Sequence, residues 1–250
     1  MVISMNLKNK VIVNFGDSIF GNKRPPNDIS TALADITGAT VYNCGFGGCR
    51  MSCHLENWDA FSMYRIATAI TERDFSYQDS IDVDSVEGMP EYFKEARELL
   101  KKIDFNKVDI ITISYGTNDY TSGRILTNHD DKKDVKSFTG ALRFSIEKIT
   151  ECYPHIKIFL CTPTYRFWMD ENGEFIEDSD TKICGASTLI DFVRATQNVA
   201  NEYHLKCINN YFELGINKFN RKYYFPNNDG THHNINGAKL IAEHMASELF

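Results

Sequence analysis

Long apolar segments are missing from this chain of 250 residues. Runs such as Ile110–Ile113 are far shorter than the ~18–20 apolar residues that a membrane-spanning helix requires, so we expect no membrane partner. Met1–Lys10 also lacks the apolar stretch of ~7–15 residues that marks a secretory signal. We therefore expect a cytoplasmic protein, while a secreted protein that has lost its leader would show the same pattern.

A surplus of positive charge is missing as well. The chain has 27 Lys and Arg against 34 Asp and Glu, a formal net charge of −7. Binding to nucleic acid requires clustered Lys and Arg, so nucleic acid is excluded as a main partner. The 7 cysteines are an odd number in a chain long enough to need no disulfides. They indicate reduced thiols in a cytoplasmic protein.

Recognisable metal and nucleotide motifs are also missing. Cys44, Cys49, Cys53 and His54 do not follow the spacing of zinc or iron–sulfur sites, and a second ligand pair is lacking. The acidic residues of 79–87 lack the register of a calcium loop. No G-x-G-x-x-G or Walker loop follows the first apolar burst, which argues against a nucleotide binder. We expect no metal and no organic cofactor.

Short apolar bursts alternate with helical patterns along the whole chain. Continuous bursts rich in Val and Ile are typical of strands buried on both faces of a parallel sheet. The expected strands are Val11–Phe15, Thr40–Asn43, Val108–Ser114, Lys157–Thr162 and Lys206–Asn209. The expected helices cover 29–36 (capped by Asp28), 92–103, 142–149, 189–200 and 238–249. Strict alternation predicts a three-layer α/β/α sandwich, which we interpret as a single domain over 1–250.

Two segments interrupt this pattern. Residues 74–89 are acidic and without clear period, so we expect a surface loop there. Residues 168–187 form an insertion in which Asn172-Gly173, flanked by aromatic and aliphatic residues, predicts a hairpin with a type I′ turn. Ligands bind beyond the carboxyl ends of strands in such sheets. The insertion follows a strand and is therefore expected to cover the site as a lid.

Polar segments containing glycine follow the first three strands, and another precedes the last helix. These segments are Gly16-Asp17-Ser18, Asn43-x-Gly45-x-x-Gly48, Gly116-Thr117-Asn118-Asp119 and Asp229-x-x-His232. Together they supply what acyl transfer needs: a nucleophile, a base, a group that orients the base, and donors for an oxyanion. Ser18 suits the nucleophile, His232 the base, and Asp229 the orienting group.

In these four segments, and in their order, the sequence resembles the SGNH hydrolase (GDSL esterase/lipase) superfamily. The resemblance extends over almost the whole chain and implies a flavodoxin-like fold. It implies Ser18 as nucleophile, Asp229 and His232 as its triad partners, and Ser18, Gly48 and Asn118 as oxyanion donors. Gly45 is interpreted as structural. His233 stands where many members have proline.

Five further residues are candidates for substrate contact. Tyr165, Arg166 and Trp168 follow the fourth strand and could line a sugar or acyl pocket. Arg50 directly follows the second segment and could hold a polar or anionic part of the substrate. Asp17 is included with them, although capping the first helix or holding the Ser18 loop is the favoured interpretation.

The sequence thus predicts a serine esterase for a small-molecule ester, acting through an acyl-enzyme. The acidic insertion favours a short-chain (acetyl) ester of a carbohydrate or another small polar molecule. Alternatives are a lysophospholipase or thioesterase-type acyl hydrolase, and a non-catalytic sugar-binding module on the same fold. The G-x-S-x-G elbow of the other large serine-esterase fold is absent from the sequence. The oligomeric state is not predicted.

Overall fold

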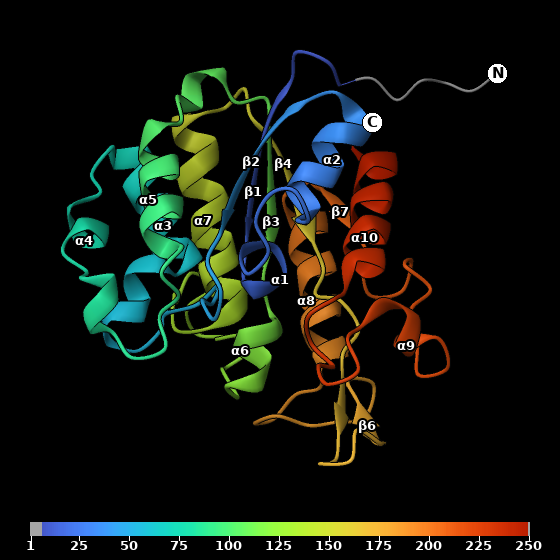
Figure 1. Cartoon of the computed structure of the whole chain (residues 1–250). Coiled ribbons are helices and arrows are strands. Elements are labelled where there is room, and N and C mark those ends of the chain that lie inside the picture. Colours follow the sequence, from blue (N-terminus) through green and yellow to red (C-terminus); the bar gives the residue numbers. More distant parts are fainter. Residues whose placement is uncertain (1–6, 250) are drawn as a thin grey trace.

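The apolar bursts form a parallel sheet in the computed structural model, which describes residues 7–249 (Figure 1). The strand order in this five-stranded sheet is β2-β1-β3-β4-β7, the order of flavodoxin-like folds. The strands are β1 (Val11–Gly16), β2 (Thr40–Gly45), β3 (Ile110–Ser114), β4 (Lys157–Cys161) and β7 (Lys206–Ile208). The predicted three-layer α/β/α sandwich is confirmed.

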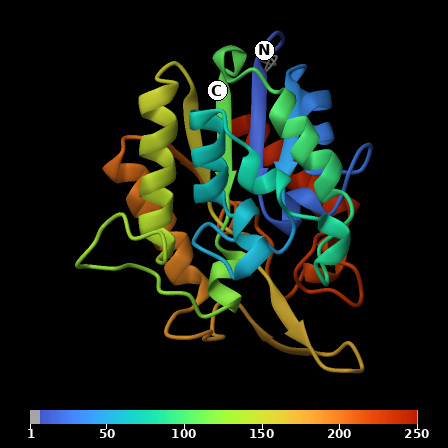
Figure 2. The ribbon, with the colours of Figure 1, turned by 90° about the vertical axis from the view of Figure 1, so that its left-hand side faces the viewer.

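Helices cover both faces of this sheet. The long helices are α2 (Ile29–Thr37), α3 (Met63–Glu72), α5 (Phe93–Lys102), α7 (Phe138–Cys152), α8 (Leu189–Glu202) and α10 (Ile235–Glu248). In Figure 1, α3, α5 and α7 lie on the left of the sheet and α2 and α10 on the right, while α8 packs beside α7. Figure 2 shows α3, α5 and α7 from the front, covering the strands. Each layer buries its apolar side against the sheet.

Shorter elements connect these helices and strands. They are α1 (Ser18–Gly21), α4 (Ser76–Asp79), α6 (Thr117–Thr121), α9 (Arg221–Tyr224), and the 3₁₀ turns η1 (Glu56–Phe61), η2 (Val83–Ser85) and η3 (Phe105–Lys107). The segment 74–89 is therefore more ordered than the predicted loop, because it contains α4 and η2. Its residues Gln78, Ile81, Val83 and Met89 are buried, which gives these turns a core to pack on.

Helix α10 and the five strands of the sheet begin and end close to their predicted bounds. Helix α3, in contrast, was not predicted. Its sequence is rich in Ile and Thr, residues that favour strands over helices. Met63, Ile66 and Ile70 nevertheless lie on one buried face of the helix. Tertiary packing therefore outweighs local propensity in α3.

The insertion forms an antiparallel hairpin of β5 (Phe167–Met169) and β6 (Phe175–Asp178), which departs from strict βα alternation. The predicted type I′ turn is wrong, because such a turn needs positive φ at both central residues and only Gly173 has it (φ +79°). Asp170 explains the difference. Its carboxylate accepts hydrogen bonds from the N–H groups of Asn172 (2.9 Å) and Glu174 (2.8 Å), which stabilises a longer turn.

The buried apolar side chains of the described residues, apart from Ala69, belong to one hydrophobic cluster that spans both faces of the sheet. The assignment of 1–250 to one domain stays a prediction. The first six residues of Met1–Lys10, where no secretory signal was found, lie outside the described residues. No helix within 7–249 is both long and apolar enough to cross a membrane.

Asp28, which is 1% exposed, holds the start of α2 to the end of β2. Its carboxylate accepts from the N–H groups of Ser30 and Thr31 and from Asn43 Nδ2 (3.1 Å). We expect Asp28→Ala to lower the free energy of unfolding by about 2 kcal/mol, since it removes a cap and leaves a buried donor short of an acceptor. Asp104→Ala, at the exposed cap of η3, should cost under about 1 kcal/mol. Equal urea midpoints for the two variants would contradict this role.

Candidate active site

Ser18 begins the short helix α1 directly after β1. Asp17 forms its N-cap, accepting a hydrogen bond from Ile19 N–H (3.0 Å). Helix α1 packs closely on the end of β2, where a Cβ on Gly21 would lie 2.6 Å from the carbonyl oxygen of Gly45. Gly45 is therefore structural, as expected. The two glycines let α1 pack close to the end of β2, which keeps Ser18 at the carboxyl edge of the sheet.

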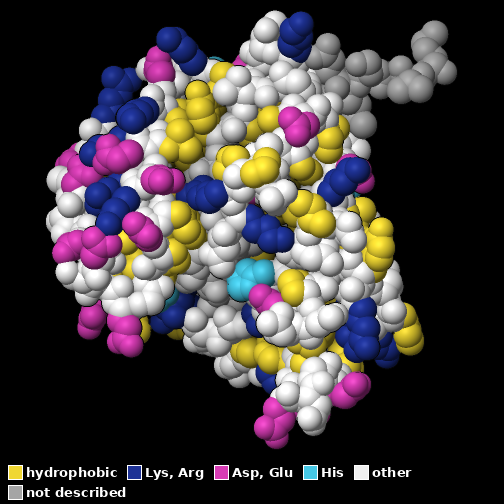
Figure 3. Space-filling view, viewed as in Figure 1, with side chains coloured by type: hydrophobic (Ala, Val, Ile, Leu, Met, Phe, Trp, Pro, Cys, Tyr) yellow, Lys and Arg dark blue, Asp and Glu magenta, His cyan; other side chains and the backbone are white. Residues whose placement is uncertain are grey.

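Ser18, His232 and Asp229 form a hydrogen-bonded series. Ser18 Oγ lies 2.8 Å from His232 Nε2, and His232 Nδ1 lies 2.7 Å from Asp229 Oδ2. Ser18 is 8% exposed, whereas the His232 side chain is 35% exposed. Figure 3 shows a histidine side chain in a hollow near the middle of the viewed face, next to an acidic side chain. The fold thus brings these three residues, which the sequence singled out, within hydrogen-bond distance of one another.

Asp229 also organises the loop that carries His232. Its Oδ1 accepts hydrogen bonds from the backbone N–H groups of Thr231 (2.7 Å) and His232 (3.0 Å). Burial of the carboxyl group opposes ionisation, but the hydrogen bonds from His232 and Thr231 outweigh it and lower the pKa of Asp229 to about 2. The carboxylate is therefore ionised at neutral pH and accepts the Nδ1 proton. That tautomer leaves Nε2 as a proton acceptor facing Ser18 Oγ.

Hydrogen-bond donors gather around Ser18. Within residues 7–249, the backbone N–H groups of Ser18 and Gly48 have no hydrogen-bond partner. Asn118 Nδ2 donates one hydrogen bond to the carbonyl oxygen of Cys49 (2.9 Å) and has a second N–H to offer. Ser18, Gly48 and Asn118 all line one cavity of about 540 Å³, here called the Ser18 cavity. Their use as oxyanion donors stays a prediction.

Asp119, the neighbour of Asn118, connects the loop after β3 to the loop after β2. It is fully buried and accepts hydrogen bonds from the N–H groups of Met51 (2.9 Å) and Ser52 (3.0 Å). Burial raises the pKa of Asp119, against the effect of these hydrogen bonds. The sequence motif placed Asp119 near the site but did not reveal this supporting contact. Through these hydrogen bonds, Asp119 holds the segment after Gly48 against α6.

The predicted substrate-binding residues separate into two groups. Arg166 and Trp168 line the Ser18 cavity, with the Arg166 guanidinium 4.5 Å from the Trp168 ring centre. Asp17, Arg50 and Tyr165 do not line it. Each of these three binds protein instead: Asp17 caps α1, Arg50 Nη2 donates to Ser122 Oγ (2.7 Å), and Tyr165 Oη donates to Asp178 Oδ2 (3.0 Å). Burial raises the pKa of Asp17 to about 6.

Other residues of the cavity wall were not singled out from the sequence. They are Asn22, Gly47, Trp58, Gly88, Pro90, Thr121 and Thr231. Trp58 follows no strand and belongs to η1, so its place at the site depends on tertiary structure alone. Thr231 was available from the sequence, because it lies between Asp229 and His232.

The hairpin forms the wall of a second, adjoining cavity of about 600 Å³, here called the hairpin cavity. It shares Arg166, Trp168 and Thr231 with the Ser18 cavity. The base of the hairpin is joined to the Asp229–His232 loop by a hydrogen bond from Phe167 N–H to the carbonyl oxygen of Gly230 (3.0 Å). The role of this segment as a lid stays a prediction.

No cluster of three or more His, Cys, Asp or Glu side chains suited to a metal ion occurs within the described part of the chain. Cys44 and Cys49 are buried, and burial raises the pKa of both thiols, to about 12 for Cys44. They therefore stay protonated and pack as small apolar groups beside the second motif.

His233, next to the candidate base, has a different environment. It is 4% exposed, and its ring lies 4.4 Å from the ring of Phe225 between centres. Neither of its ring nitrogens has a hydrogen-bond partner in the described residues. Burial lowers the pKa of His233 to about 3. His233 is thus a neutral core side chain. It stands at the position where the resemblance to the SGNH superfamily leads us to expect proline.

Comparison with known proteins places the chain in an enzyme family. The model of the GDSL-like lipase/acylhydrolase family matches residues 12–245. No curated protein matches the sequence. A solved protein from Lactobacillus plantarum is similar at 19% identity and TM-score 0.67, covering 98% of each chain.

Two similar structures have named activities. Est24, a carbohydrate acetylesterase from Sinorhizobium meliloti, has 14% identity and TM-score 0.53, covering 96% of this chain and 98% of its own. The acetyl xylan esterase AlAXEase has 17% identity and TM-score 0.56, covering 96% and 100%. At these identities the likeness shows a shared fold.

Gly48 has φ +79°, and a Cβ there would lie 3.0 Å from the Trp58 ring. We expect Gly48→Ala to lower kcat on an ester about 100-fold, because both strain and the displaced ring move the N–H donor. Gly215→Ala is the matched control, since Gly215 also has positive φ (+67°) but open space around it. Both variants should lose about 1 kcal/mol of stability. Equal kcat values in the two variants would count against Gly48 as a donor.

Since the folded protein holds His233 neutral down to about pH 3, protonation below the ordinary value of ~6.5 favours the unfolded chain. The stabilising contribution is complete above pH 6.5 and is lost as pH falls toward 3. Between pH 7 and pH 5 the protein should lose about 2 kcal/mol from this group. His233→Asn should abolish that part of the loss, measured by urea unfolding at both pH values. The exposed control His129→Asn should retain it, and identical losses in all three proteins would refute the assignment.

Proposed function

The chain belongs to the GDSL-like lipase/acylhydrolase family and is a hydrolase of ester bonds, and from that premise we propose that it is a serine esterase working through an acyl-enzyme. The observation that carries the proposal is the series Ser18 Oγ, His232 and Asp229, with contacts of 2.8 and 2.7 Å. A serine hydroxyl is a weak nucleophile until a neighbouring base takes its proton. His232 Nε2 is at the right distance for that transfer.

In the first half-reaction, Ser18 Oγ attacks the ester carbonyl carbon while its proton passes to His232 Nε2. The carbonyl π bond opens and its electron pair moves onto the oxygen. When the tetrahedral intermediate collapses, the bond from carbon to the alcohol oxygen breaks. The alcohol takes the proton from His232 and leaves the acyl group on Ser18. Asp229 stabilises the imidazolium and keeps its orientation.

In the second half-reaction, a water molecule attacks the acyl-enzyme and gives a proton to His232. The bond between the acyl carbon and Ser18 Oγ then breaks, the acid leaves, and Ser18 Oγ takes the proton back from His232. In both steps the N–H groups of Ser18 and Gly48 and the Asn118 amide would stabilise the negative oxygen. Among the described residues these donors make no other hydrogen bond, apart from one Asn118 N–H. Preorganised donors of this kind are worth ~10²–10³ in kcat each.

The substrate we propose is a short-chain, acetyl-type ester of a carbohydrate or another small polar alcohol. The Ser18 cavity offers Trp58 and Trp168 as flat apolar surfaces, and polar groups such as Asn22 and Thr231 for hydroxyl contacts. The hairpin cavity is lined by polar residues that include Asn172, Asn227 and Asn228. A long acyl chain would need a continuous apolar trough. Est24, a carbohydrate acetylesterase, and AlAXEase, an acetyl xylan esterase, agree with this choice.

We further propose that the chain acts as one domain in which the hairpin covers the site. The hydrogen bond from Phe167 to Gly230 supports this, because it couples the hairpin base to the loop of the candidate base. A Cβ on Gly230 would lie 2.1 Å from the Phe167 carbonyl oxygen, so the backbones approach as closely as glycine allows.

Ser18→Ala should lower kcat on 4-nitrophenyl acetate by about 10⁴-fold or more, because no attacking oxygen remains. Urea unfolding should show a folded protein, since within residues 7–249 the Ser18 side chain has no hydrogen-bond partner except His232. The exposed control Ser80→Ala should keep full activity. A fluorophosphonate should label Ser18 in the natural protein, as located by mass spectrometry. Normal turnover by Ser18→Ala would end the proposal.

A further inference from the structure

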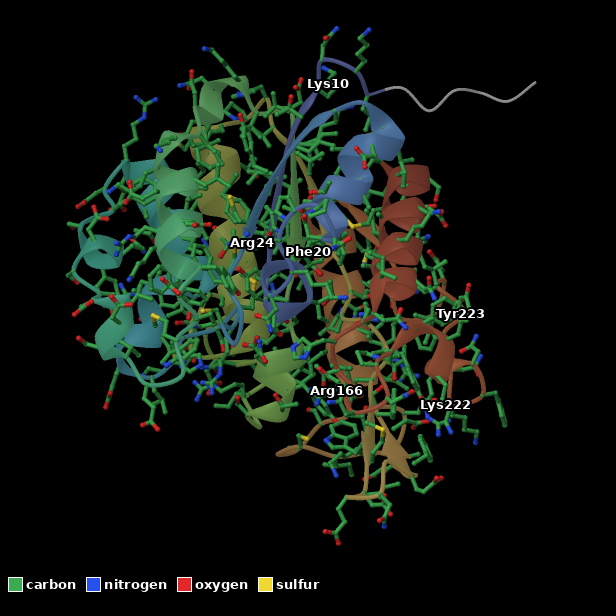
Figure 4. All side chains as sticks on the ribbon, viewed as in Figure 1. Lys10, Phe20, Arg24, Arg166, Lys222 and Tyr223 are labelled. Carbon is green, nitrogen blue, oxygen red and sulfur yellow. The ribbon has the colours of Figure 1, made fainter. Side chains whose placement is uncertain are left out.

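Arg166 has no acidic partner, although it lies beside the candidate catalytic residues. Within residues 7–249 its guanidinium makes no hydrogen bond and no ion pair, and its Nε is buried without a partner. Its contact is the face of the Trp168 ring, 4.5 Å from the ring centre. Figure 4 shows Arg166 where the hairpin begins, to the right of α6 and below the ends of the strands. The residue thus presents unused donors to the site.

Its position is the junction of two cavities. Arg166 lines the Ser18 cavity of about 540 Å³ and the hairpin cavity of about 600 Å³. The Ser18 cavity also contains Ser18, His232 and the oxyanion donors proposed above. A molecule whose ester lies at Ser18 would therefore bring a neighbouring part of itself against Arg166.

A half-buried cation without an ion pair is costly, because it has lost part of its hydration. Asp17 and Asp229 attract Arg166, but neither forms an ion pair with it in the described residues. Burial accordingly lowers the pKa of Arg166. The planar guanidinium also has paired N–H donors that match the two oxygens of a carboxylate. An anionic ligand that enters the cavity would supply the partner that these donors lack.

The two acids that attract Arg166, Asp229 and Asp17, accept their hydrogen bonds from other groups. Asp229 accepts from His232 and Thr231, and Asp17 accepts from Ile19 N–H. Lys182 lies over the same Trp168 ring, 4.9 Å from its centre, but is paired with Glu177 (3.1 Å). Arg50, the sequence candidate for an anionic group, hydrogen-bonds Ser122. Arg166 is thus the cation of the Ser18 cavity wall among the described residues.

We infer that Arg166 selects ester substrates that carry a carboxylate close to the scissile bond. This inference rests on the proposed serine-esterase function and narrows its substrate class to acidic esters. The carboxylate could belong to the alcohol, as in an acetylated hydroxy acid or uronic acid, or to the acyl group, as in a half-ester of a dicarboxylic acid. In both, the charge binds Arg166 while the ester carbonyl lies at Ser18.

Matched substrate pairs that differ by one charge test this selection. The alcohol-side pair is 3-acetoxybenzoate and its methyl ester, and the acyl-side pair is 4-nitrophenyl hydrogen succinate and 4-nitrophenyl methyl succinate. We expect kcat/KM to favour the acid over the neutral ester by about 10- to 100-fold in one of the pairs. The pair that shows this preference identifies the side of the ester that carries the charge.

Substitution of Arg166 separates charge recognition from a structural role. Arg166→Gln should abolish the preference, measured as the ratio of kcat/KM for the acid to kcat/KM for the neutral ester, and Arg166→Lys should retain part of it. Arg143→Gln, which removes a guanidinium paired with Glu202 on the surface, should change neither value. The preference of the natural protein should also shrink in 0.5 M NaCl, a measurement that needs no variant.

Binding without turnover keeps this inference distinct from the proposed function. Both tryptophans of the chain line the Ser18 cavity, so their fluorescence reports its occupation. Ser18→Ala protein should bind 3-acetoxybenzoate or hydrogen succinate ester at least about 10-fold more tightly than the neutral partner. Failure to hydrolyse any ester would overturn the serine mechanism, while this binding difference would still support Arg166. Equal affinities and equal rates within both pairs, or a preference that survives Arg166→Gln, would overturn the inference.

Discussion

Strand β1 lies between β2 and β3, and every group of the proposed mechanism depends on that position. In a parallel sheet the carboxyl ends of neighbouring strands meet at one edge. The three loops that follow these strands therefore converge, and they carry Ser18, Gly48 and Asn118. The loop before α10 brings His232 to the same edge, although 214 residues separate it from Ser18. Buried Val and Ile side chains that stabilise the sheet thus also set the spacing of polar groups that never contact them.

Three carboxylates near this edge have different tasks because their surroundings differ. Asp229 receives hydrogen bonds from the His232 ring and from two backbone N–H groups, which keep it ionised. Asp119 is completely buried and holds the loop after β2 through Met51 and Ser52. Asp17 caps α1 and is the least compensated of the three, since burial raises its pKa to about 6. Asp229 therefore orients the candidate base, whereas Asp17 and Asp119 fix the backbone conformation around the site.

The strands and most of the long helices could be predicted because buried parallel strands and amphipathic helices leave a periodic signal. Asp28 could also be recognised as a cap, because its side chain acts on backbone groups only two and three residues away. Helix α3 and the hairpin turn could not be predicted in this way. Packing on the core stabilises α3 against its own propensity, and the Asp170 carboxylate selects a turn other than the one that Asn172-Gly173 favours.

By itself the sequence determined which residues are candidates for the chemistry and in which order they follow the strands. Motifs such as Asp229-x-x-His232 act over a single turn, so their geometry is local and can be inferred from spacing. Tertiary structure alone decided which neighbouring side chains face the cavity. Arg50 and Arg166 look equivalent in the sequence, yet Arg50 hydrogen-bonds Ser122 away from the cavity, whereas the Arg166 guanidinium lines the cavity and makes no hydrogen bond in the described residues. That difference arises from contacts between segments far apart along the chain, which no local pattern records.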